Sequence, residues 1–127
     1  MSLAKFLSDE FFATLQSNLV SDQKWTDGVR SVKTSIMITV NDTGQSYLLS
    51  VEDGNTSLQK AAAGGTAEFS FDGAYEAWAK VGRGEVDLQS AVLKGFLRFR
   101  GSITKILLYR ERFLRLAELM RAIPTEF

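Results

Sequence analysis

The segment FDGAYEAWAKVGRGEVDLQSAVLKGFLRFRG, residues 71–101, alternates short apolar runs with glycines and contains neither histidine nor cysteine. Its spacing predicts a short helix that ends at Gly82, because glycine commonly terminates helices. Asp87 can cap a second short helix, which Gly95 closes. Residues 96–100 then alternate between apolar and basic side chains, which predicts a strand.

Upstream of this segment the sequence predicts one helix and four strands. Ser8 can cap a helix that runs to about Val20, and residues 21–28, which are polar apart from Trp25, are predicted to form a loop. Alternating apolar residues predict strands at 31–40, 45–52, 56–61 and 67–72, separated by turn sequences that include Asn41-Asp42-Thr43-Gly44 and Gly64-Gly65. Four consecutive strands with short turns predict an antiparallel meander with one apolar face.

Downstream of it, a long helix is expected from Ser102 to about Ala122, before Pro124. On a helical wheel its apolar residues form one broad stripe: Ile106, Tyr109, Phe113, Leu116, Ala117 and Met120, extended by Ile103, Leu107 and Leu114. Leu108 and Leu119 fall outside the stripe among Lys105, Arg112 and Arg115, while Arg110 and Arg121 project into it. Two interpretations stay open: a wide core face with scattered surface leucines, or a side that contacts a lipid or a second subunit.

Length and charge narrow the class of protein. The 127 residues predict one domain, residues 1–127. Lys+Arg and Asp+Glu are 15 each, and this neutral balance speaks against a nucleic-acid partner. The first residues, MSLAKFLSDEFF, lack the pattern of a signal peptide, and no apolar run is long enough to span a bilayer. We therefore expect a cytoplasmic protein without an integral membrane segment.

The side chains that most often carry chemistry are absent from the sequence. There is no histidine and no cysteine, which removes the commonest general base, thiol nucleophiles and the usual nitrogen and sulfur metal ligands. The carboxylates lie mainly in predicted turns and at helix ends, and Ser90 with Lys94 is a helical i, i+4 pair. We expect no enzymatic activity, no cofactor and no metal.

Five motifs of the segment 71–101 resemble the sterol carrier protein 2 (SCP2) sterol-binding domain family. They are Phe71-Asp72-Gly73, Tyr75-Glu76-Ala77-Trp78, Gly84-Glu85-Val86-Asp87, Ala91-Val92-Leu93-Lys94-Gly95 and Leu97-Arg98-Phe99-Arg100-Gly101. The resemblance covers nearly the whole chain and suggests a stand-alone member of prokaryotic type. It implies an α+β fold, a five-stranded, mostly antiparallel sheet covered on one face by helices, with an apolar cavity between. Phe96 departs from the family, whose carriers often have a polar residue there.

The resemblance also implies a non-catalytic carrier that holds a fatty acid, acyl-CoA, phospholipid, isoprenoid or sterol in an apolar tunnel. Strand parity and helix phase predict the residues that line it: Ile36, Ile38, Leu49, Phe69, Phe71, Trp78, Leu88, Val92, Leu97, Phe99 and Phe113. Arg98, Arg100 and Arg110 are candidates for binding the head group of an anionic ligand. Such a carrier is compatible with transient contact with a membrane.

The main alternative is an interaction module of the same fold with a filled core and no lipid ligand. It would form a homodimer or dock a partner through Phe96, Leu108 and Leu119. A third hypothesis is an accessory domain that delivers a hydrophobic substrate to a partner enzyme. A large continuous apolar cavity favours the carrier, and a dry, packed interior with a concentration-dependent mass favours the interaction module.

Overall fold

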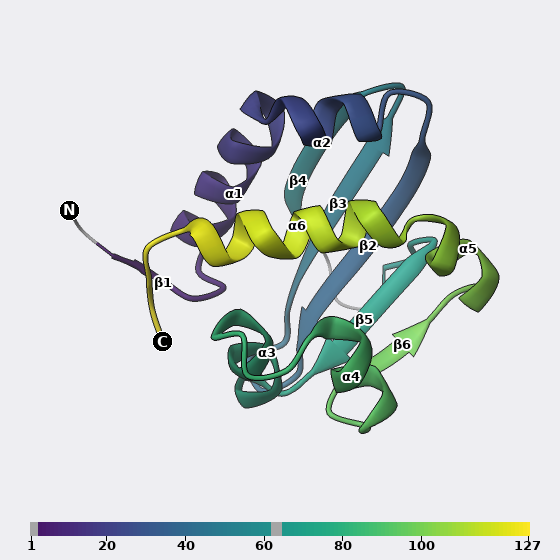
Figure 1. The fold of residues 1–127 in the computed structure, drawn as a ribbon. Helices are drawn as coiled ribbons and strands as arrows, with labels where there is room; N and C mark the ends of the chain where they lie inside the picture. Colours follow the sequence, from purple (N-terminus) through teal and green to yellow (C-terminus); the bar gives the residue numbers. More distant parts are fainter. Residues whose placement is uncertain (1–2, 62–64) are drawn as a thin grey trace.

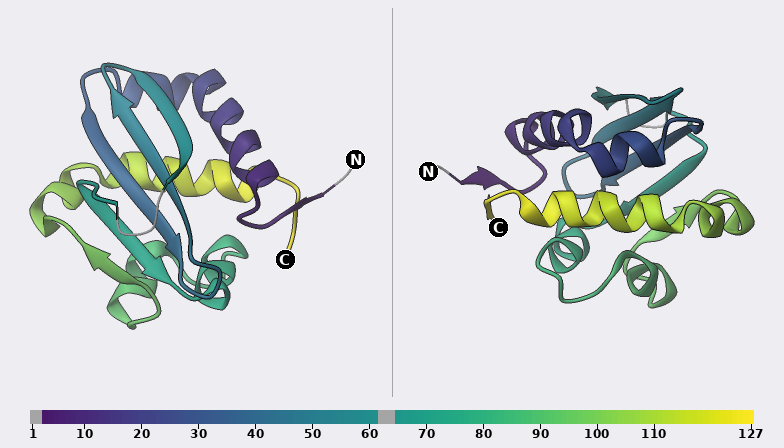
Figure 2. Two further views of the ribbon diagram at one scale, coloured as in Figure 1. Left: turned by 180° about the vertical axis from the view of Figure 1, so that it is seen from behind. Right: turned by 45° about the horizontal axis from the view of Figure 1, so that its top comes forward.

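Five strands form one sheet in the order β4-β3-β2-β5-β6, and helices lie on one of its faces, in a computed structural model that describes residues 3–61 and 65–127. The strands are β2 (Lys33–Val40), β3 (Gln45–Glu52), β4 (Asn55–Ala61), β5 (Phe69–Gly73) and β6 (Arg98–Arg100). The helices are α1 (Asp9–Ser21), α2 (Gln23–Gly28), α3 (Tyr75–Gly82), α4 (Leu88–Leu93), α5 (Ile103–Leu108) and α6 (Arg110–Ala122). α6 crosses the covered face of the sheet (Figure 1), and the view from behind shows the other face without helices (Figure 2). The expected α+β class and five-stranded, mostly antiparallel sheet are confirmed.

The predicted meander is correct for three strands and wrong for the fourth. β2, β3 and β4 pair in antiparallel order, but β5 pairs in parallel with β2, with Ile36 opposite Phe69. This places β2, whose Ile36, Met37 and Ile38 are all buried, at the centre of the sheet. β4 therefore remains an edge strand, where the Gln16 side chain of α1 accepts a hydrogen bond from the Leu58 N–H at 2.9 Å. β2, β5 and β6 also begin two residues later than predicted, and Gly64 lies outside the described residues.

The predicted loop at 21–28 is instead mostly helical. Asp22 ends α1 and caps α2, because its carboxylate accepts a hydrogen bond from the Trp25 N–H at 2.7 Å. The cap starts a helix whose only strongly apolar side chain, Trp25, is 3% exposed. The sequence predicted a loop here because a short helix that buries a single apolar side chain shows no periodic apolar pattern.

The single helix predicted from Ser102 to Ala122 is two helices that meet at Tyr109. The first helix begins where it was predicted to begin, with Ser102 as its cap, and α6 starts at Arg110. Leu116 is the buried residue of α6, and Leu119, predicted to lie outside the apolar stripe, packs against the core. Leu114, predicted to extend the stripe, is 50% exposed. The main stripe is thus confirmed, because Ile106, Tyr109, Phe113, Leu116 and Met120 all pack against the core, and its edge includes Leu119 in place of Leu114.

Helices α3 and α4 follow β5 along the chain, and α3 is bonded to the sheet. Asp87 caps α4 as predicted, accepting a hydrogen bond from the Ser90 N–H at 2.7 Å. Trp78 of α3 is buried, and its indole N–H donates to the Thr39 carbonyl of β2 at 2.9 Å. Two short strands that the sequence did not predict, β1 (Ala4–Lys5) and β7 (Thr125–Glu126), pair in parallel near the ends of the chain.

Candidate functional site

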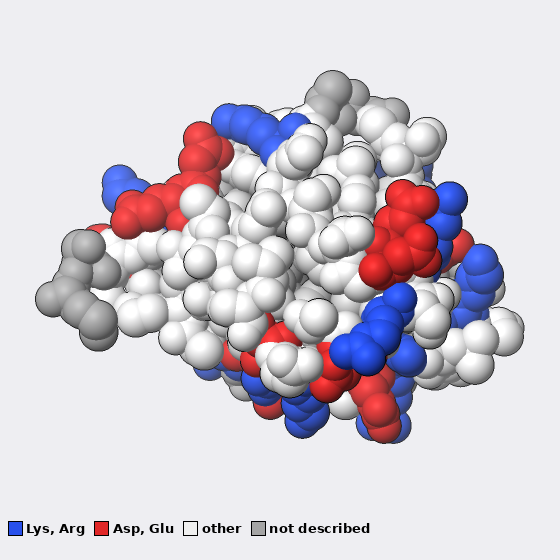
Figure 3. All heavy atoms as spheres, turned by 90° about the horizontal axis from the view of Figure 1, so that it is seen from above, with Lys and Arg blue, Asp and Glu red and all other residues white. Residues whose placement is uncertain are grey.

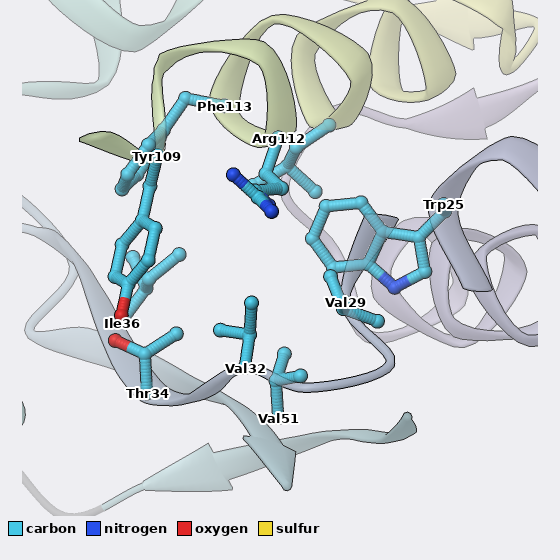
Figure 4. A pocket seen from close by; sticks show the side chains of 10 residues that line it. Trp25, Val29, Val32, Thr34, Ile36, Val51, Tyr109, Arg112 and Phe113 are labelled. Atoms are coloured by element: carbon cyan, nitrogen blue, oxygen red, sulfur yellow. The ribbon is translucent and has the colours of Figure 1, made fainter. Parts of the chain in front are cut away.

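A narrow apolar pocket lies between the sheet and helices α2 and α6. Ten residues line it: Trp25, Val29, Val32, Thr34, Ile36, Val51, Tyr109, Arg112, Phe113 and Leu116. Figure 4 shows their side chains converging on a common space from α2 and the residues after it, from β2 and β3, and from the start of α6. We call these residues the Trp25–Arg112 pocket. All of them except Thr34 and Arg112 present apolar or aromatic groups, so the pocket suits the apolar part of a ligand.

The indole of Trp25 forms one wall of this pocket, and hydrogen bonds fix both the backbone and the ring of this residue. The Asp22 cap fixes its backbone, and its ring N–H donates to the hydroxyl of Thr56 in β4 at 2.9 Å. Because the polar edge of the ring is already bonded, the remaining surface of the indole is apolar. Trp25 therefore contributes a rigid apolar wall rather than a polar contact.

Arg112 is the one charged residue among those that line the pocket. Its Nε donates to the Gly28 carbonyl at 2.8 Å, where α2 ends, and its Nη1 donates to the Leu108 carbonyl at 3.3 Å. The guanidinium carbon lies 5.7 Å from the centre of the Tyr109 ring. A guanidinium has five N–H donors, so after these two bonds it still has donors to offer an anion. Figure 4 shows the group among the apolar side chains, between Trp25 and Tyr109.

The free space in this pocket is small. The free volume inside it is about 20 Å³, which is room for about one water molecule. A site for a drug-sized or lipid ligand has roughly 300–1,000 Å³. In this conformation the interior is packed, and a long-chain ligand would need α6 to move away from the sheet.

The cavity residues predicted from the sequence occupy two environments. Ile36 and Phe113 line the Trp25–Arg112 pocket. The others lie in the packed core next to it: Ile38, Leu49, Phe69, Phe71, Trp78 and Leu97 are buried, and Leu88, Val92 and Phe99 are half-buried against them. The Phe113 ring contacts the Phe69 and Phe71 rings edge-on, with centroids 5.7 Å and 6.0 Å apart, so the pocket and this aromatic cluster are continuous.

The three arginines predicted to bind a head group lie outside the pocket lining. Arg98 donates to the Asp72 carboxylate at 3.1 Å, with Asp72 on the neighbouring strand. Arg100 and Arg110 are exposed, and the described residues place no carboxylate within ion-pair distance of either. Arg112, which the helical wheel had placed outside the apolar stripe, is the arginine that reaches the pocket.

Sequence reasoning missed most of the lining, including Trp25, Tyr109 and Arg112. Two local signals point to these residues. Asp22 precedes Trp25 by three residues, the spacing of a helix cap, which predicts a short helix that buries the indole. Arg112 lies three residues after Tyr109 and four before Leu116, so it shares a helix face with both.

A second, open groove lies between α1 and strands β3 and β4. It has a volume of about 600 Å³ and is lined by Asp9, Phe12, Ala13, Gln16, Ser17, Val20, Tyr47, Leu58 and Lys60. The Tyr47 hydroxyl donates to the Asp9 carboxylate, and burial together with this bond raises the pKa of Tyr47 to about 12. The phenol thus stays protonated at neutral pH and serves as a donor that links α1 to the sheet.

The described surface offers few features of other functional classes. Within residues 3–61 and 65–127, no cluster of acidic side chains could hold a metal ion, and no helix has the length and hydrophobicity needed to cross a bilayer. Seen from above, the face over α1 and α2 has an uncharged middle, and charged side chains of both signs lie around its margin (Figure 3). That view shows no extended basic surface of the kind that binds nucleic acid.

Comparison with known proteins relates the chain to sterol carriers. The model of the SCP-2 sterol transfer family matches residues 12–113. A crystal structure of sterol carrier protein 2 aligns with a TM-score of 0.81 and 16% identity, covering 94% of this chain and 99% of that one. A conserved hypothetical protein from Thermus thermophilus, described as possibly a sterol carrier protein, aligns with a TM-score of 0.77 and 14% identity, covering 99% and 94% of the two chains.

The same fold also occurs as a small part of a larger enzyme. The stereoselective inverting sec-alkylsulfatase from Pseudomonas sp. aligns with a TM-score of 0.62 and 18% identity, covering 94% of this chain but 16% of the sulfatase. No curated protein sequence matches the chain. At these identities the structural matches establish the fold.

Proposed function

The chain belongs to the SCP-2 sterol transfer family, and from this premise we propose that it is a non-catalytic carrier of one hydrophobic ligand, a fatty acid, acyl-CoA, phospholipid, isoprenoid or sterol. The apolar part of the ligand lies between the sheet and α6, and enters through the Trp25–Arg112 pocket. The family and the fold point to lipid binding or transfer as the general activity. The pocket supplies the proposed place and orientation of the ligand.

The observation that carries this proposal is an apolar pocket with a single guanidinium among its walls. Burial of each CH₂ group contributes about 0.8 kcal/mol, so even a short alkyl segment in contact with Trp25 and Phe113 gains several kcal/mol before losses of freedom. Arg112 can bind a carboxylate or phosphate with two parallel N–H donors. We therefore add Arg112 to the predicted head-group residues Arg98, Arg100 and Arg110.

Opening of the pocket is proposed to occur by displacement of α6. Leu116 is the buried residue of this helix, and Phe113, Leu119 and Met120 are partly buried against the core. Hydrogen bonds to α2, from Arg112 to Gly28 and from Arg115 to Asp22, also hold the helix in place. A ligand that enters must therefore replace the apolar contacts that α6 loses as it moves. A ligand tail that takes the place of the Phe113 ring would reach the aromatic cluster of Phe69, Phe71 and Phe99, all of which are predicted cavity residues.

The test begins with native mass spectrometry of freshly purified protein, followed by solvent extraction and lipid identification. The proposal expects a co-purified amphiphile near one per chain, or binding of at least one member of a panel of fatty acids, acyl-CoAs, quinones and sterols. An apo mass together with no binding across the panel would reject the carrier function.

A variant then tests the orientation of the ligand. Arg112→Gln should weaken binding of a long-chain carboxylate by about tenfold or more, because it removes a charge-assisted hydrogen bond, and should leave binding of the corresponding alcohol unchanged. Arg30→Gln, at an exposed arginine just beyond the end of α2, is the matched control. An equal loss of carboxylate and alcohol would show that Arg112 supports the pocket without binding a head group.

The second candidate function is the interaction module that forms a homodimer or docks a partner. The packed interior, with about 20 Å³ of free space in the pocket, is the observation that favours it. Sedimentation over a range of concentrations distinguishes the two: a mass that rises with concentration, in a protein that binds no lipid, supports the interaction module.

A further inference from the structure

Four exposed apolar side chains lie on α5 and the first half of α6. Ile103, Leu107, Leu108 and Leu114 are 62%, 61%, 69% and 50% exposed, and we call them the α5–α6 patch. α5 lies at one end of the molecule, beyond β6 and away from α1 (Figures 1 and 2). Four exposed branched aliphatic residues within twelve positions form a cluster rather than the single exposed leucines of an ordinary surface.

The charge of this part of the chain differs from that of the rest. Residues 98–123 contain seven of the 15 Lys and Arg residues and two of the 15 Asp and Glu residues, a net charge of +5. The remainder carries the opposite net charge of −5. The chain is neutral as a whole, but its charge is unevenly distributed: the segment with β6, α5 and α6 is positive and the other residues together are negative.

Arginines stand inside the apolar patch. Arg110 begins α6 two residues after Leu108 and precedes Leu114 by four, so Arg110 and Leu114 share one side of α6. Arg100 precedes α5 directly, and both arginines are exposed without an ion-pair partner among the described residues. The nearby acidic groups are mostly engaged: Glu68 binds Lys105 at 2.8 Å and Glu118 binds Arg115 at 3.3 Å. Glu111 is then the carboxylate of the segment that has no ion pair among the described residues.

The patch also adjoins the Trp25–Arg112 pocket. The carbonyl of Leu108, a patch residue, accepts a hydrogen bond from Arg112, and the next residue, Tyr109, lines the pocket. A ligand that leaves beside Arg112 would therefore emerge next to Leu108. This adjacency connects the surface with the proposed movement of α6.

From these observations we infer that the α5–α6 patch docks on an anionic lipid bilayer, with the four aliphatic side chains among the acyl chains and Arg100 and Arg110 on the phosphates. Apolar side chains with flanking cations are the chemistry that holds a helix at such an interface. A second copy of this chain fits less well, because a twofold contact would bring the same arginines of both copies together. The functional role of this docking rests on the proposed carrier function.

The experiment is flotation of the full chain with phosphatidylcholine vesicles and with vesicles of equal parts phosphatidylcholine and phosphatidylglycerol. Binding is expected to the anionic vesicles and to fall steeply with salt. Arg110→Glu should weaken it by at least about tenfold, since the change removes a cation from the anionic surface and adds a like charge in its place. Leu107→Gln with Leu108→Gln should also weaken it by roughly tenfold, because both side chains lose their insertion into the acyl region.

Two controls carry the same changes elsewhere. Lys24→Glu reverses an exposed charge on α2, and Val20→Gln removes an apolar side chain of α1 that is 54% exposed. Both should bind anionic vesicles like the wild type. Thermal unfolding should be unchanged in all four variants, because every altered side chain is at least half exposed or charged at the surface.

Three results would overturn the inference: equal binding to neutral and anionic vesicles, unchanged binding in the Arg110→Glu and Leu107→Gln, Leu108→Gln variants, or self-association of the wild type that the leucine changes abolish. Failure of the carrier function is recognised separately. A protein whose pocket takes no ligand from the panel can still float with anionic vesicles, and a protein that ignores vesicles can still bind a ligand in solution.

Discussion

Asp22 and Arg115 lie 93 positions apart in the sequence and form an ion pair, with Nη2 of the arginine 2.5 Å from Oδ1 of the aspartate. The same carboxylate caps α2 through the Trp25 N–H. One side chain therefore starts the helix that carries a pocket wall and binds the helix that covers the pocket. Both partners are largely shielded from water, with side chains 15% and 25% exposed, so the pair is screened less than a surface pair.

Asp22→Asn separates these two roles. Asparagine caps helices well but carries no charge, so the variant should keep α2 and lose the ion pair. We expect the free energy of unfolding, measured with urea at neutral pH, to fall by about 1–2 kcal/mol. Asp27→Asn breaks the exposed pair with Arg30 at the end of the same helix and should change it by less than about 1 kcal/mol.

The same pair predicts a pH dependence. The hydrogen bond from Arg115, and then that from the Trp25 N–H, hold the pKa of Asp22 below its ordinary value of 3.8, while burial opposes them. A lowered pKa in the folded state means that the stabilisation is fully present above 3.8 and is lost as the pH falls through the folded-state pKa. The stability difference between wild type and Asp22→Asn should therefore stay constant from neutral pH to about 3.8 and shrink below it. A difference that shrinks already near neutral pH would contradict this assignment.

The two tryptophans of the chain provide a spectroscopic test of the pocket. Trp25 lines it, whereas Trp78 is buried in the packed core against Thr39. If a ligand enters beside Trp25, its binding should change tryptophan emission in the wild type and in Trp78→Phe, and the change should disappear in Trp25→Phe. The reverse pattern, with the signal lost in Trp78→Phe, would place the ligand under α3.

Trp78→Ala should be strongly destabilising. The side chain is 3% exposed and its N–H is bonded to β2, so truncation leaves a cavity and an unpaired carbonyl. We expect a loss of about 3–5 kcal/mol in the free energy of unfolding by urea denaturation. Trp78→Phe keeps most of the volume and should cost clearly less, and similar losses for both variants would mean that the hydrogen bond dominates.

Gly73 and Gly28 give a matched pair of backbone tests. A Cβ atom added at Gly73 would lie 2.5 Å from the Leu97 side chain and 2.9 Å from the Phe96 carbonyl oxygen, whereas one at Gly28 would lie 3.9 Å from Arg112. Gly73→Ala should therefore lower the melting temperature, with a cost of about 1–3 kcal/mol from forced movement of β5 against residues 96–97. Gly28→Ala should be neutral or slightly stabilising.

Local chemistry allowed much of this fold to be predicted. The caps at Ser8, Asp87 and Ser102 and the alternation in β2 and β3 depend on residues a few positions apart, which a sequence displays directly. The pairing of β5 with β2 is different. Alternation shows which side chains share a face of a strand but does not show which strands are neighbours. The strand order is set instead by the burial of β2 at the centre of the sheet.

The pocket was harder to predict because its walls come from separate parts of the chain. Trp25, Ile36, Val51 and Tyr109 are brought together by the sheet and by the crossing of α6, which no local pattern records. Arg112 is placed among apolar residues because the carbonyl of Gly28, at the end of α2, accepts a hydrogen bond from it. A helical wheel assigns an arginine to the solvent side and cannot anticipate an acceptor 84 positions away.

The pairing of β1 with β7 has a consequence for how this unit can be joined to others. Ala4 lies opposite Thr125 in a parallel pair, so the two end segments of the fold lie close together but leave the pair in opposite directions. A linker that closes the chain would therefore have to turn back along the pair, and new ends could then be opened at an exposed turn such as 41–44 without breaking the sheet. A connection to another protein at each end would likewise leave the fold in opposite directions from neighbouring positions.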